Sequence, residues 1–86
     1  MLDHVFSALS DPSRRRILKL LKKRDMTVAE IKVHFPFTGA TLSHHLDMLK
    51  RANLVISERE GQFIRYSLNT SVFEDILSTI SSLFPS

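Results

Sequence analysis

Residues 37–55 read Phe-Thr-Gly-Ala-Thr-Leu-Ser-His-His-Leu-Asp-Met-Leu-Lys-Arg-Ala-Asn-Leu-Val, and this stretch decides the fold. The residues that recur here at i, i+3, i+4 and i+7, the spacing of one face of an amphipathic helix, are Leu42, His45, Leu46 and Leu49. Thr38 is suited to cap the N-terminus. The other face begins with small hydroxyls and an imidazole, which are short enough to hydrogen-bond base edges in a DNA major groove. The pattern predicts a recognition helix.

A short helix is predicted just before this stretch. Thr27 and Glu30 stand in a capping-box relation, in which each side chain satisfies a free backbone N–H of the other residue. The helix carries Ile31 and Phe35 inward, and Pro36 stops it. Together with the recognition helix it forms a predicted helix-turn-helix.

Two further helices are predicted upstream. Asp11 and Pro12 are a strong start signal for a helix that runs to about Lys23, because aspartate caps well and proline needs no N–H at the first helical position. Its apolar face is made of Ile17, Leu18, Leu20 and Leu21. Residues 1–9 have helical spacing too, but a helix below about 12 residues is marginal in water, so this one must pack on something.

Positive charge is concentrated in the second of these helices. Seven of the twelve Lys and Arg residues lie between Arg14 and Arg24, and the formal net charge is +3, which weakly favours an anionic partner. The cluster Arg14, Arg15, Arg16 has two open interpretations. It contacts nucleic acid, or it is a solvated face with one arginine paired to an acid such as Asp11.

A β-hairpin is predicted after the recognition helix. β-branched and aromatic residues in 55–59 and 62–68 flank a Glu60-Gly61 turn, so the hairpin forms a wing. Arg59 and Gln62 flank its tip and Arg65 lies further along, where they can reach phosphates or the minor groove. For Arg65 a purely protective charge on the hairpin edge is an equal alternative.

The final segment, residues 70–84, is predicted to be an amphipathic helix capped by Asn69, or by Ser71 with Glu74 as a second capping box. Its apolar stripe consists of Val72, Phe73, Ile76, Leu77, Ile80, Leu83 and Phe84. This is more than a small core needs, so we expect a dimer interface shared with residues 2–9, through Leu2, Val5, Phe6 and Leu9. Packing within one protomer is the alternative.

The bulk composition indicates one globular domain, residues 1–86, with a mainly α fold (α+β) of approximately five helices plus a small β-hairpin wing. The absence of cysteine removes disulfides and thiolate-metal sites and fits a reducing cytoplasm. No apolar run suits a membrane span or a signal peptide. The sequence has no nucleophile elbow, phosphate-binding glycine loop or metal-ligand set, so we do not expect an enzyme.

Three blocks resemble the ArsR/SmtB family of winged-helix repressors: residues 9–18, residues 42–55, and residues 58–62 with 65–68. The Ser-His-His-Leu box and the Tyr-Ser-Leu-Asn run before the last helix look closest to the SdpR-like autorepressor branch. The resemblance implies a cytoplasmic homodimer that binds a pseudo-palindromic operator, associates with the nucleoid when bound, and represses transcription, often its own.

The resemblance also implies which residues contact DNA. In the recognition helix these are Thr38, Gly39, Ala40, Thr41, Ser43 and His44, and in the wing they are Arg59 and Gln62. Position 39 departs from the family pattern, which often has glutamine there. Glycine removes a base-reading side chain, so we expect the backbone to approach DNA closely instead, and Thr41, Ser43 and His44 to carry more of the readout.

Metal sensing is not expected. Family sensors use a cysteine box on the third helix or Asp/His sets on the last one, whereas residues 27–31 here lack cysteine and the last helix lacks histidine. His44 and His45 are adjacent and point to different helix faces, so we interpret His45 as a packed core residue and His44 as a DNA contact. No cofactor is predicted. A sequestering protein or a small-molecule effector as the releasing signal stays open.

One other class of function competes with DNA binding. Winged helices also serve as protein-interaction modules that do not bind DNA specifically, since a fold does not determine a function. The discriminating feature is where the basic residues lie relative to the exposed face of the recognition helix.

Overall fold

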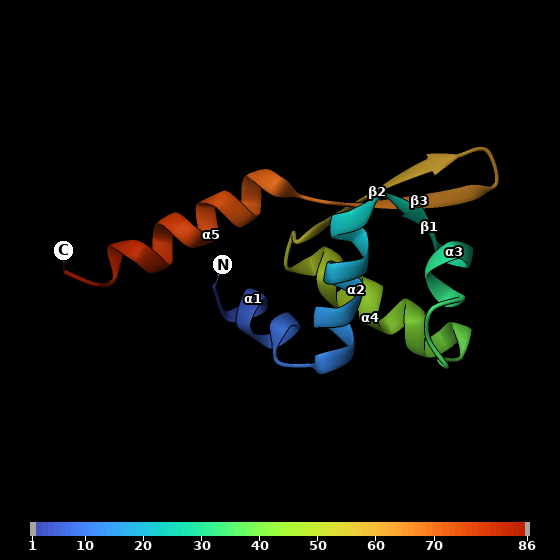
Figure 1. The fold of residues 1–86 in the computed structure, drawn as a ribbon, viewed down its shortest axis with the longest axis horizontal. Helices are drawn as coiled ribbons and strands as arrows, with labels where there is room; N and C mark the ends of the chain where they lie inside the picture. Colours follow the sequence, from blue (N-terminus) through green and yellow to red (C-terminus); the bar gives the residue numbers. More distant parts are fainter. Residues whose placement is uncertain (1, 86) are drawn as a thin grey trace.

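The computed structural model describes residues 2–85, which fold into five helices and a three-stranded antiparallel sheet (Figure 1). The helices are α1 (Leu2–Leu9), α2 (Pro12–Lys23), α3 (Val28–Lys32), α4 (Gly39–Arg51) and α5 (Thr70–Ser82), and the strands are β1 (Met26–Thr27), β2 (Val55–Glu60) and β3 (Phe63–Leu68). The predicted helices and the hairpin wing are therefore confirmed. None of the helices within residues 2–85 is both long and apolar enough to cross a membrane.

The start of α2 follows its sequence signal. Asp11 Oδ1 accepts hydrogen bonds from the backbone N–H groups of Ser13 at 2.7 Å and Arg14 at 3.2 Å. Pro12 occupies the first helical position, where its missing N–H costs nothing. The local sequence alone therefore sets where α2 begins.

The helix α3 starts as predicted but ends early. The N–H of Glu30 donates to Thr27 Oγ1 at 3.3 Å, and the N–H of Thr27 donates to Glu30 Oε1 at 3.0 Å, which completes the capping box. The helix stops at Lys32 rather than next to Pro36. The N–H of Phe35 then donates to the carbonyl of Lys32 at 3.2 Å, an i to i+3 bond that closes a tighter turn. Phe35 is buried from this turn, not from the helix.

Both ends of α4 are fixed by local hydrogen bonds. Thr38 Oγ1 accepts from the N–H of Thr41 at 3.1 Å, as the sequence predicts. At the other end Asn53 has a φ of 59°, and the N–H groups of Asn53 and Leu54 donate to the carbonyls of Lys50 at 2.9 Å and Leu49 at 3.0 Å. This is a Schellman motif, in which asparagine takes the left-handed position usually given to glycine. The chain turns directly from α4 into β2.

The sheet has the strand order β1-β3-β2. The wing register runs from Val55 opposite Leu68 to Glu60 opposite Phe63, so the turn consists of Gly61 and Gln62, one residue later than predicted. Gly61 has a φ of +61°, which favours glycine. The two-residue strand β1, which pairs with β3, was not predicted, because two residues show no periodicity.

The last helix, α5, extends away from the body, so the molecule measures 47 × 23 × 20 Å (Figure 1). Asn69 caps it by accepting a hydrogen bond from the N–H of Val72 at 3.4 Å. The alternative capping box of Ser71 and Glu74 is wrong, because Ser71 already lies inside the helix. Within α5, Ile76 is buried in the core of the protomer.

The short helix α1 is held by a buried arginine of α2. Arg14 is only 8% exposed; its Nε donates to the carbonyl of Ala8 at 2.8 Å and its Nη2 to that of Ser7 at 3.1 Å. These carbonyls lie in the last turn of α1, where helical carbonyls run short of intrahelical donors, and that of Ser7 also accepts from the hydroxyl of Ser10 at 2.7 Å. Neither interpretation of the basic cluster is right for Arg14, which is neither solvated nor available to DNA.

Replacing Arg14 by alanine is expected to lower the free energy of unfolding by about 3 kcal/mol, because the buried carbonyl of Ala8 and the buried Nδ1 of His45 lose their donor. Urea unfolding followed by circular dichroism measures the loss. Arg15→Ala is the matched control: Arg15 Nη1 also binds a carbonyl of α1, that of Leu9 at 2.7 Å, but at the surface. We expect the control to lose less than about 1 kcal/mol. Equal losses would contradict the assigned role of Arg14.

Candidate nucleic-acid interface

The helix α4 separates its two faces as its sequence predicts. Leu42, His45, Leu46 and Leu49 are buried against the core. The residues at the start of this helix that are predicted to contact DNA are all exposed, and they are Thr38, Gly39, Ala40, Thr41, Ser43 and His44. They form one polar surface over the cap and the first two turns of the helix. No large side chain there obstructs the close approach of a double helix.

The N-terminus of α4 offers several hydrogen-bond donors to an external partner. Thr38 donates its hydroxyl to Thr41 Oγ1 at 3.0 Å and accepts the N–H of Thr41, which leaves the hydroxyl proton of Thr41 available. The first backbone N–H groups of a helix, here those of Gly39 and Ala40, have no intrahelical partner. Such N–H groups favour an anion, phosphate included.

Gly39 is not required by packing inside the protomer. A Cβ built at this position would meet only the flexible Nζ of Lys32, at 3.9 Å, and Gly39 lies in the first turn, where glycine weakens a helix least. Packing inside the protomer would therefore tolerate a side chain at position 39. What its absence changes is the surface, because a partner can approach the backbone there.

The strand register divides the wing into two faces. Arg59 is opposite Ile64 and Ser57 is opposite Tyr66, so these four residues share one face of the hairpin. Closer to the body of the protein, this same face packs on the core. Glu58 and Arg65 pair on the other face. Arg59 and Ile64 thus project together from the core-facing side of the wing.

Arg59 and Gln62 are both exposed near the tip of the wing. Arg59 Nε donates to the carbonyl of Gly61 at 3.1 Å, which holds the side chain against the turn and leaves its other N–H groups free. Ile64 is 45% exposed beside Arg59. Its apolar side chain was not singled out from the sequence, and only the register reveals its place.

Arg65 does not share the setting of Arg59. Its Nε lies 2.9 Å from Glu60 Oε2, and its Nη1 lies 3.7 Å from Glu30 Oε1. The hydrogen bond and charge of Glu60 raise the pKa of Arg65, so the guanidinium stays charged. The structure favours the alternative in which Arg65 protects the hairpin and ties it to α3, on the face opposite Arg59.

His45 is the buried polar residue of α4, as predicted. Its Nδ1 lies 3.3 Å from Arg14 Nη1, and because a guanidinium has no acceptor, Nδ1 must carry the lone pair. Phe37 packs against the imidazole with ring centroids 5.1 Å apart. Burial lowers the pKa of His45, and the charge of Arg14 lowers it further against the opposing effect of Asp11. His45 is therefore neutral at pH 7, and the exposed His44 is the histidine available to a partner.

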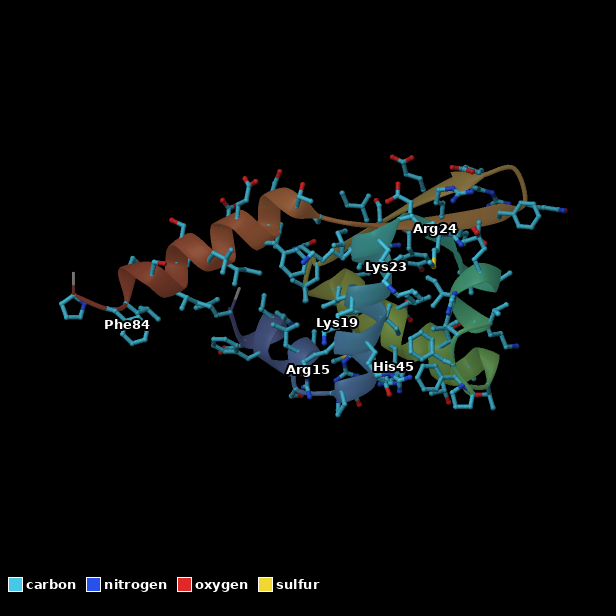
Figure 2. All side chains as sticks on the ribbon, viewed as in Figure 1. Arg15, Lys19, Lys23, Arg24, His45 and Phe84 are labelled. Carbon is cyan, nitrogen blue, oxygen red and sulfur yellow. The ribbon has the colours of Figure 1, made fainter. Side chains whose placement is uncertain are left out.

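The predicted dimer surface is only partly available. Phe6, Leu77, Leu83 and Phe84 are each more than half exposed, and Figure 2 shows Phe84 at the far end of α5, away from the body. Leu2, Leu9, Val72, Phe73 and Ile80 are half-buried. Val5 and Ile76, also predicted for the interface, are 0% and 5% exposed and belong to the core of the protomer, so their side chains are not offered to a partner.

Potential metal ligands do not gather in the part of the chain that the structure describes. No three His, Asp or Glu side chains of residues 2–85 lie close enough together to hold a metal ion. The adjacent His44 and His45 rings have centroids 5.9 Å apart and belong to different faces of α4.

Comparison with known proteins gives a consistent result. Residues 11–57 match the family described as "Bacterial regulatory protein, arsR family". The chain is 49% identical to the transcriptional repressor SdpR of Bacillus subtilis, over 90% of this chain and 86% of the relative. It is 34% identical to an arsenical resistance operon repressor of Staphylococcus aureus, over 93% of this chain and 77% of the relative.

A solved structure extends the likeness to three dimensions. The homodimeric winged helix-turn-helix DNA-binding domain of a possible ArsR-family regulator from Mycobacterium bovis superimposes with a TM-score of 0.78. It is 26% identical, and the match covers 95% of this chain and 76% of that one.

The environment of His45 predicts a pH dependence of stability. Its pKa is lowered in the fold from the ordinary value of 6.5, so below that pH the unfolded chain binds more protons than the folded chain, and acidification destabilises the fold. We expect the free energy of unfolding to be constant above about pH 7 and to fall between pH 6.5 and pH 5. Urea titrations across this range measure it.

The control for this prediction is His45→Gln, which keeps an acceptor for Arg14 but does not titrate. Hydrogen bonds to Thr27 and Arg24 lower the pKa of Glu30 from 4.5 to about 2, so the loss of stability linked to Glu30 falls mainly below pH 4.5, under the range tested. An acid loss between pH 6.5 and pH 5 that persists unchanged in the variant would assign the effect to another group.

Proposed function

Because the chain belongs to the arsR family of bacterial regulatory proteins, we propose that it is a sequence-specific transcriptional repressor that binds double-stranded DNA as a homodimer. The observation that carries this proposal is the exposed polar start of α4. Six consecutive or near-consecutive small or polar positions, 38–41, 43 and 44, face outward while the opposite face is anchored in the core. A surface of this kind fits a major groove.

The wing contributes contacts outside the major groove. Arg59 and Gln62 flank the turn, and Arg59 retains free guanidinium donors that suit a phosphate or a narrow minor groove. The free N–H groups of Gly39 and Ala40 supply a second phosphate contact at the start of α4. The side chains of Thr41, Ser43 and His44 are left to read base edges.

Metal ions have no part in this proposal. The chain lacks cysteine, and α5 lacks histidine, so thiolate and imidazole ligands are missing from the two places where family sensors hold them. The relative from Staphylococcus aureus is named for arsenical resistance, and that name is not transferred to this chain. Repression, including repression of its own gene, then responds to protein concentration or to a ligand of another kind.

Genomic selection tests the proposal directly. Fragments of the host genome that the protein retains are expected to share a pseudo-palindrome whose half-sites lie about one helical turn, or 34 Å, apart. Fluorescence anisotropy with such a duplex should show an affinity that falls steeply with salt concentration, because phosphates release counterions. Equal affinity for a shuffled duplex would favour the protein-interaction alternative.

Ser43→Ala and His44→Ala should each lower the ratio of specific to non-specific affinity by roughly tenfold, because a base contact contributes about 1–3 kcal/mol of discrimination. Anisotropy titrations with the selected and the shuffled duplex measure this ratio. Arg59→Gln should instead weaken both titrations equally, as a phosphate contact does. Arg65→Gln, on the other face of the wing, is the control and should leave DNA affinity within about twofold.

Dimerisation is proposed to use the exposed side chains of α1 and α5. Leu77 and Leu83 are 66% and 65% exposed, and α5 carries no basic residue. The double variant Leu77→Glu, Leu83→Glu is expected to sediment as a monomer, because two carboxylates would be buried in the interface. Val33→Glu is the matched control, since Val33 is 84% exposed but lies at the end of α3. A double variant that stays dimeric would refute this interface.

A further inference from the structure

The helix α2 has a basic face that the proposed DNA interface does not use. It buries Arg14, Ile17, Leu18 and Leu21 and exposes Arg15, Arg16, Lys19, Lys22 and Lys23. Figure 2 shows Arg15, Lys19 and Lys23 following one another along the same side of the helix. The buried side of α2 packs on α4 through the contact of Arg14 with His45. The basic face therefore points away from α4 and from its exposed side chains.

A hollow of ≈ 330 Å³ lies on this face, between α2 and the turn that joins α3 to α4. It is lined by Arg16, Lys19, Leu20, Lys23, His34 and Phe35. The lining contains four side chains with nitrogen donors and no carboxylate. The ion pairs found within residues 2–85 join Arg24 and Arg65 to Glu30 and Glu60, so none of the four donors around the hollow is neutralised by an acid of the described chain.

The arginine of the hollow is held in place by an aromatic ring. The guanidinium carbon of Arg16 lies 5.1 Å from the centroid of the Phe35 ring, a cation–π arrangement. The same ring is stacked on Phe37, with centroids 4.9 Å apart and an interplanar angle of 3°. Phe35 thus already stacks on one aromatic ring and contacts a cation, so we expect a ligand here to be recognised by charge.

We propose that this hollow binds the diphosphate group of a small molecule, held by Arg16, Lys19 and Lys23 with His34 as a further donor. Arginine forks match phosphate oxygens, and lysines supply compact charges beside them. Three permanent positive charges balance a diphosphate better than a single phosphate or a carboxylate. The hollow is distinct from the DNA contacts assigned to α4 and the wing, and its effect on DNA, described next, rests on the proposed function.

The hollow is joined to the recognition helix by direct contacts. Phe35, in its lining, stacks on Phe37, and Phe37 packs against His45 of α4 at 5.1 Å between centroids. An anion that pulls Arg16 away from Phe35 changes the packing of this aromatic row at the turn of the helix-turn-helix. Occupancy of the hollow is thereby coupled to the position of the start of α4, and DNA affinity should respond to it.

Calorimetric titration of the full chain with inorganic pyrophosphate, without DNA, tests the binding site. We expect saturable binding of one pyrophosphate per chain that is absent with sulfate at equal ionic strength. Arg16→Gln and Lys23→Gln should each weaken it roughly tenfold, as the loss of one charge-assisted hydrogen bond does. Lys22→Gln is the matched control, because it removes the same charge from the same helix but lines the groove beside α5. It should weaken binding less than twofold.

Two results of this titration would overturn the proposal. The absence of saturable binding removes the site. If Lys22→Gln and Lys23→Gln weaken pyrophosphate binding equally, the binding is only a diffuse attraction to a basic helix and not a defined site. Both results are independent of DNA, so they leave the proposed repressor function untouched, and a failure to bind any duplex leaves the pyrophosphate site untouched.

A DNA titration distinguishes a free diphosphate from a phosphate of the operator. Without pyrophosphate, Lys23→Gln and Lys22→Gln should have the same small effect on duplex affinity. A larger loss for Lys23→Gln, with a salt slope reduced by about one, would make the hollow a DNA backbone contact and overturn the assignment. Pyrophosphate should change the duplex affinity of the natural chain beyond a sulfate control and not that of Lys23→Gln. An equal change in both would overturn the coupling.

Discussion

The buried guanidinium of Arg14 is the contact on which the arrangement of the helices depends. A permanent charge inside a protein is costly unless its donors are used, and Arg14 directs them to two carbonyls at the end of α1 and to His45 of α4. One side chain of α2 therefore joins the N-terminal helix to the recognition helix. This contact also requires a neutral imidazole, since a protonated His45 would place a second positive charge beside the buried charge of Arg14.

The features that the sequence predicts well are those set by neighbours along the chain. Asp11, Thr27, Thr38 and Asn69 cap their helices through bonds that span two or three residues. The periodicity of α4 places its exposed residues correctly for the same reason, because the helical repeat alone determines which face each residue occupies. The exposed part of the candidate interface in α4 is thus predictable from the order of its residues.

The features that escape sequence reasoning depend on contacts between distant segments. Nothing near Arg14 distinguishes it from Arg15 and Arg16, yet only Arg14 meets His45, 31 residues away. Arg65 differs from Arg59 through the hairpin register and through Glu30, which precedes it by 35 positions. Val5 and Ile76 carry the same apolar pattern as their exposed neighbours, and only the packing of the whole protomer separates core from surface.

Charge is distributed so that ionic strength acts on only one of two associations. The exposed apolar side chains of α5 have no basic residue among them, whereas the proposed DNA interface includes the exposed Arg59 of the wing and the first N–H groups of α4. The proposed pairing of protomers through α5 would be driven by apolar burial, which added salt does not weaken. Attachment to a polyanion is screened within about 10 Å at 0.1 M salt. For the proposed repressor, a rise in ionic strength would thus weaken binding to DNA while leaving the two protomers paired.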